Sequence, residues 1–181
     1  SAIREAFGRG VEGLTVFVAG AGGAGRAIAI TCAMRKAEHI MRADVMADKV
    51  GRGVAEISRL APSAKVSAVA GMPSEWAGVA RTADLVINAT PAGMRRGDKS
   101  PLGSRAFRDG QMAYDLVYVF PGTAFMKVAG RAGARTANGL GMLLHQGALS
   151  FEIWTGIKPP VKAMRKALEG AVYGRSATGG K

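Results

Sequence analysis

The segment VAGAGGAGRAI, residues 18–28, decides the fold prediction. It follows a short run rich in β-branched residues and precedes a stretch with helical spacing of apolar side chains. Its six central residues form a complete G-x-G-x-x-G sequence, which consists of Gly20, Ala21, Gly22, Gly23, Ala24 and Gly25. The first glycine permits a tight turn, the second lets a pyrophosphate approach the backbone, and the third lets the helix pack on the strand. We predict that these residues bind a dinucleotide; the alternative is a tight turn with a purely structural role.

Predicted strands and helices alternate along the chain. The predicted strands are residues 14–20, 38–44, 64–70, 83–90, 111–118 and 134–139. The predicted helices are residues 25–37, 46–61, 73–81, 123–132, 141–155 and a segment after Pro159-Pro160. This alternation predicts an α/β fold, a doubly wound and mostly parallel sheet of the Rossmann type with helices on both faces and two closing C-terminal helices. We assign residues 1–175 to one dinucleotide-binding domain and residues 176–181 to a flexible tail.

Composition limits the classes of function. Of the 181 residues, 48% are hydrophobic and 21% are charged, as in ordinary globular domains. The single Cys32 excludes an intramolecular disulfide and fits a cytoplasmic location, and two histidines argue against a metal site. No apolar run reaches the roughly 18–20 residues of a membrane span, so we expect no membrane segment. The net charge is +12, but the arginines are dispersed without interleaved aromatic residues, so we expect no nucleic-acid partner.

Two strand ends carry candidate cofactor contacts. Asp44 follows the glycine loop at the ~20-residue spacing that is typical of an acidic residue that binds a ribose 2′-hydroxyl. The alternative is that Asp44 caps the next helix. Lys49 lies just beyond it. Asn88, Ala89 and Thr90 end the strand at residues 83–90, at the carboxyl edge where such sheets bind ligands, so we expect them to contact the cofactor. The alternative for Asn88 is a turn residue.

Four segments, in this order, resemble the cofactor-binding domain of the shikimate dehydrogenase family. They are GAGGAGRAI (20–28), VINATPAGM (86–94), YDLVYVFPGTAFM (114–126) and NGLGMLLHQGALSFEIWTG (138–156). The resemblance implies reversible hydride transfer between a nicotinamide dinucleotide and 3-dehydroshikimate/shikimate, or quinate in some relatives. The alternative is a stand-alone dinucleotide-binding or regulatory module without catalysis.

The resemblance also implies roles for individual residues. Leu116, Gly139 and Met142 match residues on the nicotinamide side of the site. Tyr118 and Gln146 match residues that contact the substrate, and a Gln amide can both donate to and accept from a polyhydroxylated ring. Because Met142 and Gln146 are four residues apart, they are expected to share one helix face.

The sequence departs from the family pattern in two places. NADP-using relatives carry Asn-Arg-Thr and a later basic residue after the second strand, where this chain has Asp44, Val45, Met46 and Lys49. The arginine of the phosphate clamp is therefore missing, so we favour NAD over NADP, with Arg42 as the alternative clamp.

The second departure concerns catalysis. The resemblance assigns the catalytic lysine and aspartate to an amino-terminal substrate domain, and no residue of this chain matches either. We therefore expect that domain to be absent, and the chain to bind cofactor and hardly turn over. The expected partner is a small-molecule substrate. A homodimer is compatible with the resemblance, but no residue pattern fixes the oligomeric state.

Overall fold

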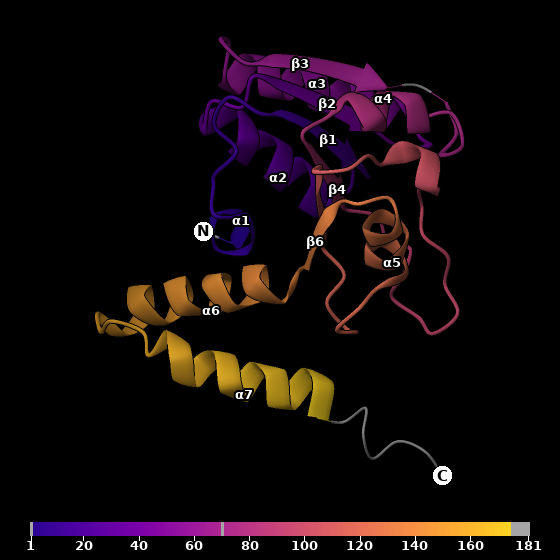
Figure 1. Cartoon of the computed structure of the whole chain (residues 1–181). Helices are drawn as coiled ribbons and strands as arrows, with labels where there is room; N and C mark the ends of the chain where they lie inside the picture. Colours follow the sequence, from indigo (N-terminus) through magenta and orange to yellow (C-terminus); the bar gives the residue numbers. More distant parts are fainter. Residues whose placement is uncertain (1, 70, 175–181) are drawn as a thin grey trace.

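The structure, a computed structural model, describes residues 2–69 and 71–174 (Figure 1). Its strands form one parallel sheet in the order β3-β2-β1-β4-β5-β6. The strands are β1 (Thr15–Ala19), β2 (His39–Ala43), β3 (Lys65–Val69), β4 (Leu85–Asn88), β5 (Met112–Asp115) and β6 (Arg135–Asn138). The predicted doubly wound α/β fold is confirmed.

Two apolar clusters fill the two faces of the sheet. Because side chains alternate along a strand, Val16 and Val18 of β1 belong to one cluster, and Phe17 and Ala19 belong to the other. The helices whose side chains join the first cluster are α1 (Ala2–Phe7), α2 (Gly23–Met34) and α3 (Ala47–Leu60). The elements of the second cluster are α4 (Ala77–Thr82), the 3₁₀ turn η1 (Ser104–Ala106) and α5 (Ala124–Arg131). The sheet is thus covered on both faces (Figure 1).

The direction of winding reverses between β1 and β4. These strands pair in parallel with Ala19 opposite Asn88, so their carboxyl ends lie side by side. The glycine loop leaves β1 at this edge, and residues 89–90 leave β4 beside it. In open sheets of this kind, such a reversal opens a crevice between the two loops, where ligands bind.

Two long helices close the chain, as predicted. Helix α6 (Leu140–Thr155) follows β6 directly and ends at Gly156, whose φ of +68° is the left-handed conformation that favours glycine. Helix α7 (Val161–Tyr173) begins after Pro160 and runs back beside α6 (Figure 1). Three side chains of α6 are buried, whereas α7 has none, so the pair is attached to the sheet mainly through α6.

Some boundaries differ from the prediction. Strand β5 ends at Asp115 instead of residue 118, because a carboxylate oxygen of Asp115 accepts the N–H of Val117 at 3.1 Å and turns the chain. Helix α4 begins four residues later than expected, and α1 was not predicted. The predicted tail, residues 176–181, lies outside the described residues.

Candidate functional site

The glycine loop has the geometry that its sequence predicted. Gly20 has a φ of +102°, and a Cβ at this position would lie 2.6 Å from the carbonyl oxygen of Ala89. A Cβ on Gly25 would overlap the carbonyl oxygen of Gly20. The first glycine therefore permits the turn and the close approach of the β4 loop, and the last lets α2 pack on the loop.

The two glycines between them face open space. A Cβ on Gly22 or Gly23 would meet no atom within 4 Å, and both residues are exposed. Gly22 is the N-cap of α2 and supplies no side-chain hydrogen bond to the first turn. The backbone N–H groups of this turn and the positive end of the helix dipole therefore face an unobstructed surface. These are the features that bind a pyrophosphate.

A groove of about 310 Å³ begins at this surface. It is lined by Gly22, Gly23, Ala24, Ala89, Thr90, Pro91, Met94, Leu116, Val117, Tyr118 and Val119. These residues come from the ends of β1, β4 and β5, so the topology unites three of the predicted segments. We call this space the cofactor groove.

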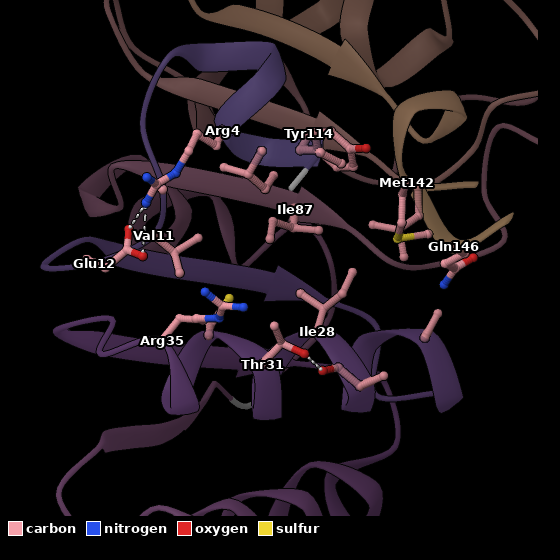
Figure 2. Close-up of a pocket in the computed structure, with 17 residues that line it drawn as sticks. Arg4, Val11, Glu12, Ile28, Thr31, Arg35, Ile87, Tyr114, Met142 and Gln146 are labelled. Atoms are coloured by element: carbon pink, nitrogen blue, oxygen red, sulfur yellow. Dashed lines mark hydrogen bonds and ion pairs between the residues drawn. The ribbon is translucent and has the colours of Figure 1, made fainter. Parts of the chain in front are cut away.

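A larger pocket of about 610 Å³ adjoins the groove. Figure 2 shows Met142 and Gln146 of α6 facing this pocket, with Ile28 and Thr31 of α2 along its opposite wall. Met142 and Gln146 therefore share one face of α6, as their spacing predicted. We call this space the α6 pocket.

Two residues, Ala24 and Leu116, line both the cofactor groove and the α6 pocket. Tyr118 lines the groove and Gln146 the pocket, so the two predicted substrate contacts lie on either side of this junction. Tyr114 also lines the pocket, although no sequence pattern singled it out. Burial raises the pKa of Tyr114 to about 12, so its hydroxyl stays protonated near neutral pH.

Asn88 is fully buried and supports the groove from behind. Its side-chain nitrogen donates to Asp115 Oδ1 at 2.8 Å, and its side-chain oxygen accepts the N–H of Thr90 at 3.0 Å. Burial raises the pKa of Asp115 above its ordinary value. These contacts fix the ends of β4 and β5, and Asn88 itself does not line the groove, whereas Ala89 and Thr90 do.

Gly139 has a steric role in the structure. A Cβ at this position would overlap the carbonyl oxygen of Leu116. The backbone between β6 and α6 therefore passes directly against the segment after β5. This approach places the first turns of α6, including Met142, next to Leu116.

Asp44 connects the end of β2 to the glycine loop. Its Oδ2 accepts the N–H of Ala21 at 2.7 Å, and its Oδ1 accepts the N–H of Met46 at 3.0 Å. Lys49 lies apart from the cofactor groove, in a separate pocket of about 240 Å³. Its lining residues are Ala21, Arg26, Arg42, Lys49, Arg52, Gly53 and Glu56. We call this space the cationic pocket.

The fold, the glycine loop and the crevice at the reversal of the sheet define a nucleotide-binding domain of the Rossmann type. The sequence model of the shikimate 5′-dehydrogenase C-terminal domain matches residues 139–169. Shikimate dehydrogenase (NADP(+)) of Methanopyrus kandleri is 36% identical over 169 residues, which are 92% of this chain and 58% of the relative.

Solved structures give the same assignment. Quinate dehydrogenase from Corynebacterium glutamicum in complex with NAD matches with a TM-score of 0.82 at 26% identity, over 91% of this chain and 57% of that one. Shikimate 5-dehydrogenase from Thermus thermophilus in complex with NADP(H) and shikimate matches with a TM-score of 0.79 at 32% identity, over 94% and 59%. This chain is therefore similar to the carboxyl-terminal domain of shikimate dehydrogenases, which confirms the resemblance seen in the four motifs.

The chain spans somewhat more than half the length of these relatives, 58% of the first. Within residues 2–69 and 71–174, none of the helices combines the length and the apolar character needed to span a membrane.

Proposed function

We propose that this chain is the cofactor-binding part of an oxidoreductase of shikimate dehydrogenase type. The reaction is reversible hydride transfer between a nicotinamide dinucleotide and 3-dehydroshikimate/shikimate, or quinate. One observation carries the proposal: the cofactor groove and the α6 pocket meet at Ala24 and Leu116. A dinucleotide in the groove and a small polar substrate by Gln146 would come into contact at this junction.

Each part of the site has a distinct task in this scheme. Gly22, Gly23 and the first turn of α2 fit the pyrophosphate because no side chain fills the space before them. Leu116 and Met142 offer apolar surface to a flat nicotinamide ring, and Met142 adapts to its shape. The bound nicotinamide supplies or accepts the hydride.

Gln146 and Tyr118 serve the substrate. Both side chains can donate and accept hydrogen bonds, which suits a ring with several hydroxyl groups and a carboxylate. They orient the reacting carbon, and correct orientation accounts for a large part of enzymatic rate enhancement.

A proton must reach the substrate oxygen as hydride is transferred to its carbon. Among the described residues that line the groove and the α6 pocket, none is a lysine or an aspartate. The resemblance assigns this role to a lysine and an aspartate of the amino-terminal domain of the relatives. In this scheme the chain binds and orients, and the proton transfer belongs to that domain.

Calorimetric titration of the 181-residue chain with NADH and NADPH tests the proposal. Binding of at least one of them in the micromolar range is expected, and absence of binding for both contradicts it. The similarity to shikimate and quinate dehydrogenases favours the enzyme over a stand-alone nucleotide-binding module. Sedimentation velocity tests the homodimer, which stays a prediction.

A further inference from the structure

Asp115, the last residue of β5, is fully buried and lies outside both the cofactor groove and the α6 pocket. Within the described part of the chain, its Oδ2 atom has no hydrogen-bond partner. Burial raises the pKa of this carboxyl group more than its hydrogen bonds lower it. Because a buried carboxyl group with an unpaired oxygen is unfavourable, packing alone does not explain an aspartate at this position.

The first contact of Asp115 turns the chain after β5. Its Oδ1 accepts the N–H of Val117 at 3.1 Å, a side-chain to backbone bond that competes with strand pairing. The following residues are apolar enough to continue the strand, but the turn brings residues 116–119 to the cofactor groove, and all four line it. A side chain that accepts no hydrogen bond at this position would allow β5 to continue and would move Leu116 away from the groove.

The second contact of Asp115 reaches the loop after β4. The same Oδ1 accepts a hydrogen bond from Nδ2 of Asn88 at 2.8 Å. The side-chain oxygen of Asn88 in turn accepts the N–H of Thr90 at 3.0 Å and its hydroxyl at 2.7 Å. Asn88 is also fully buried, and Thr90 lines the groove. One carboxyl oxygen therefore orders both loops that border the groove.

The two ends of the groove are held in different ways. At the end proposed for the pyrophosphate, the glycine loop is shaped by its own close backbone contacts and by Asp44, which accepts the N–H of Ala21 at 2.7 Å. Leu116 and Met142, which are proposed to contact the nicotinamide, lie at the other end, where Asp115 turns the chain. Replacement of Asp115 should therefore disturb the nicotinamide end and leave the pyrophosphate end intact.

We propose that Asp115 is a positioning residue for the nicotinamide end of the cofactor groove. Its Oδ1 holds Leu116 through the turn after β5, and it holds Thr90 through Asn88. The inference rests on the dinucleotide binding proposed above and adds a residue that does not touch the cofactor. It gives Asn88 the same indirect role, in place of the cofactor contact that the sequence predicted.

The test compares ligands that differ by the nicotinamide. The probes are NADH with ADP-ribose, and NADPH with 2′-phospho-ADP-ribose, each titrated calorimetrically into the 181-residue chain. In the pair that binds more tightly, we expect the dinucleotide to bind about tenfold more tightly than its counterpart without nicotinamide. Equal affinity within that pair overturns the inference and leaves dinucleotide binding intact. If none of the four ligands binds, the proposed function itself fails.

Asp115→Leu removes the hydrogen-bond acceptor and keeps a branched side chain. The affinity for the dinucleotide should fall about tenfold, whereas the affinity for its counterpart without nicotinamide should stay within about twofold. The fluorescence of bound NADH or NADPH, which reports the surroundings of the nicotinamide ring, should decrease as well. An equal loss for both ligands, as a merely structural aspartate would give, overturns the inference, and so does no loss.

Asp115→Asn is the conservative variant that should rescue binding. Its side-chain oxygen can accept both N–H groups that Oδ1 of Asp115 accepts, so the dinucleotide affinity should stay within about threefold of that of the unsubstituted chain. A loss as large as that of Asp115→Leu overturns the inference. The control Asp109→Leu replaces an exposed aspartate ahead of β5, at the opposite edge of the sheet, and should affect neither ligand.

The double variant Asn88→Leu/Asp115→Leu provides a second route if Asp115→Leu does not fold. Replacing both partners of a buried hydrogen bond by apolar groups of similar shape can be nearly neutral for stability. The double variant should therefore fold and still bind the dinucleotide about tenfold more weakly, with the counterpart without nicotinamide unaffected. Dinucleotide binding as tight as in the unsubstituted chain overturns the inference. If neither leucine variant folds, Asp115 serves the fold alone and the inference is overturned as well.

Discussion

Gly22 and Gly25 lie three residues apart in one loop, yet they differ in what they tolerate. A Cβ on Gly22 meets nothing within 4 Å, whereas a Cβ on Gly25 overlaps the Gly20 carbonyl oxygen. The first position therefore borders open space, where we propose that the pyrophosphate binds, and the second is kept small for the fold. Substitutions at the two sites separate binding from stability.

Gly22→Asp should abolish dinucleotide binding without unfolding the chain. Its carboxylate would occupy the space of the pyrophosphate, and two like charges about 4 Å apart near a protein surface repel by ~4 kcal/mol, so affinity should fall about 100-fold or more. Calorimetry measures the affinity and thermal melting the stability. Gly25→Ala is the matched control, which should lower stability by about 1–3 kcal/mol through overpacking. Unchanged cofactor affinity in Gly22→Asp would contradict the role of the loop.

Asp44→Asn should shift the cofactor preference toward NADPH. The asparagine oxygen can still accept the Ala21 N–H that Asp44 accepts at 2.7 Å, so the loop should keep its shape. Loss of the negative charge removes a repulsion of order 1 kcal/mol on a 2′-phosphate, which is about fivefold in affinity. Titration with both cofactors gives the ratio. A ratio that moves toward NADH means that Asp44 does not face the ribose.

Sequence predicted the glycine loop well, because its constraints are local backbone sterics. The burial of Arg42 depends on how α3 packs on β2, and no local pattern encodes that packing. Helix α3 carries two glycines, Gly51 and Gly53, but a Cβ would overlap Arg42 only at Gly53, so the glycines alone did not indicate the contact. The steric role of Gly139 could not be predicted for the same reason. The atom that a Cβ there would overlap is the carbonyl oxygen of Leu116, which is far away in the sequence.

At the scale of elements, buried strands were easier to predict than their ends. All four residues of β4 and of β5 are buried, which matches the apolar runs in the sequence. The end of β5 was missed because a side-chain hydrogen bond from the Val117 N–H to Asp115 turns the chain, although the following residues are apolar enough to continue a strand. Six-residue α1 was missed because short helices are stabilised by tertiary contacts and not by their own sequence.

One of these contacts joins α1 to both closing helices. Glu5 of α1 accepts hydrogen bonds from His145 of α6, at 2.8 Å, and from Arg165 of α7. Burial alone would raise the pKa of Glu5, but the hydrogen bonds and the charges of His145 and Arg165 bring it below its ordinary value. Helix α7 has no buried side chain, so polar contacts of this kind contribute to its attachment.

Attachment of α7 should weaken in acid. Because the pKa of Glu5 is lowered in the folded chain, its contribution is complete above the unfolded pKa and is lost as the pH falls through the folded value. Glu5→Gln should speed amide exchange in α7 up to about fivefold near neutral pH, since exposed pairs contribute about 0.2–1 kcal/mol. Glu169→Gln, an exposed acid on α7, is the control and should have no effect. If the amide exchange rates of α7 are equal in the two variants, Glu5 does not contribute to the attachment of α7.

At the scale of the whole molecule, the site is open on the side of α6. Gln146 is exposed, and Leu149, Ile153 and Trp154 farther along α6 are exposed as well, Trp154 by 83%. Together with the length of the relatives, this fits a nucleotide-binding part that holds one wall of the substrate site. Cofactor binding and turnover are therefore separable properties.

The 181-residue chain alone should bind cofactor and show no measurable oxidation of shikimate or quinate. Gln146 and Tyr118 are the proposed contacts on one side of the substrate. Within the described residues, no lysine or aspartate lines the groove or the α6 pocket, so the lysine–aspartate pair that the resemblance assigns to proton transfer is missing there. Joining the amino-terminal domain of the Methanopyrus kandleri relative ahead of residue 1 should restore turnover, and that domain alone is the control.

Gln146→Ala in the fusion should raise KM more than it lowers kcat, because the amide is proposed to bind the substrate and not to transfer protons. Turnover by the chain alone at roughly 1 s⁻¹ or faster, a rate typical of enzymes, would assign the proton transfer to a residue within it, with Tyr118 of the groove and Tyr114 of the α6 pocket as the groups to replace first.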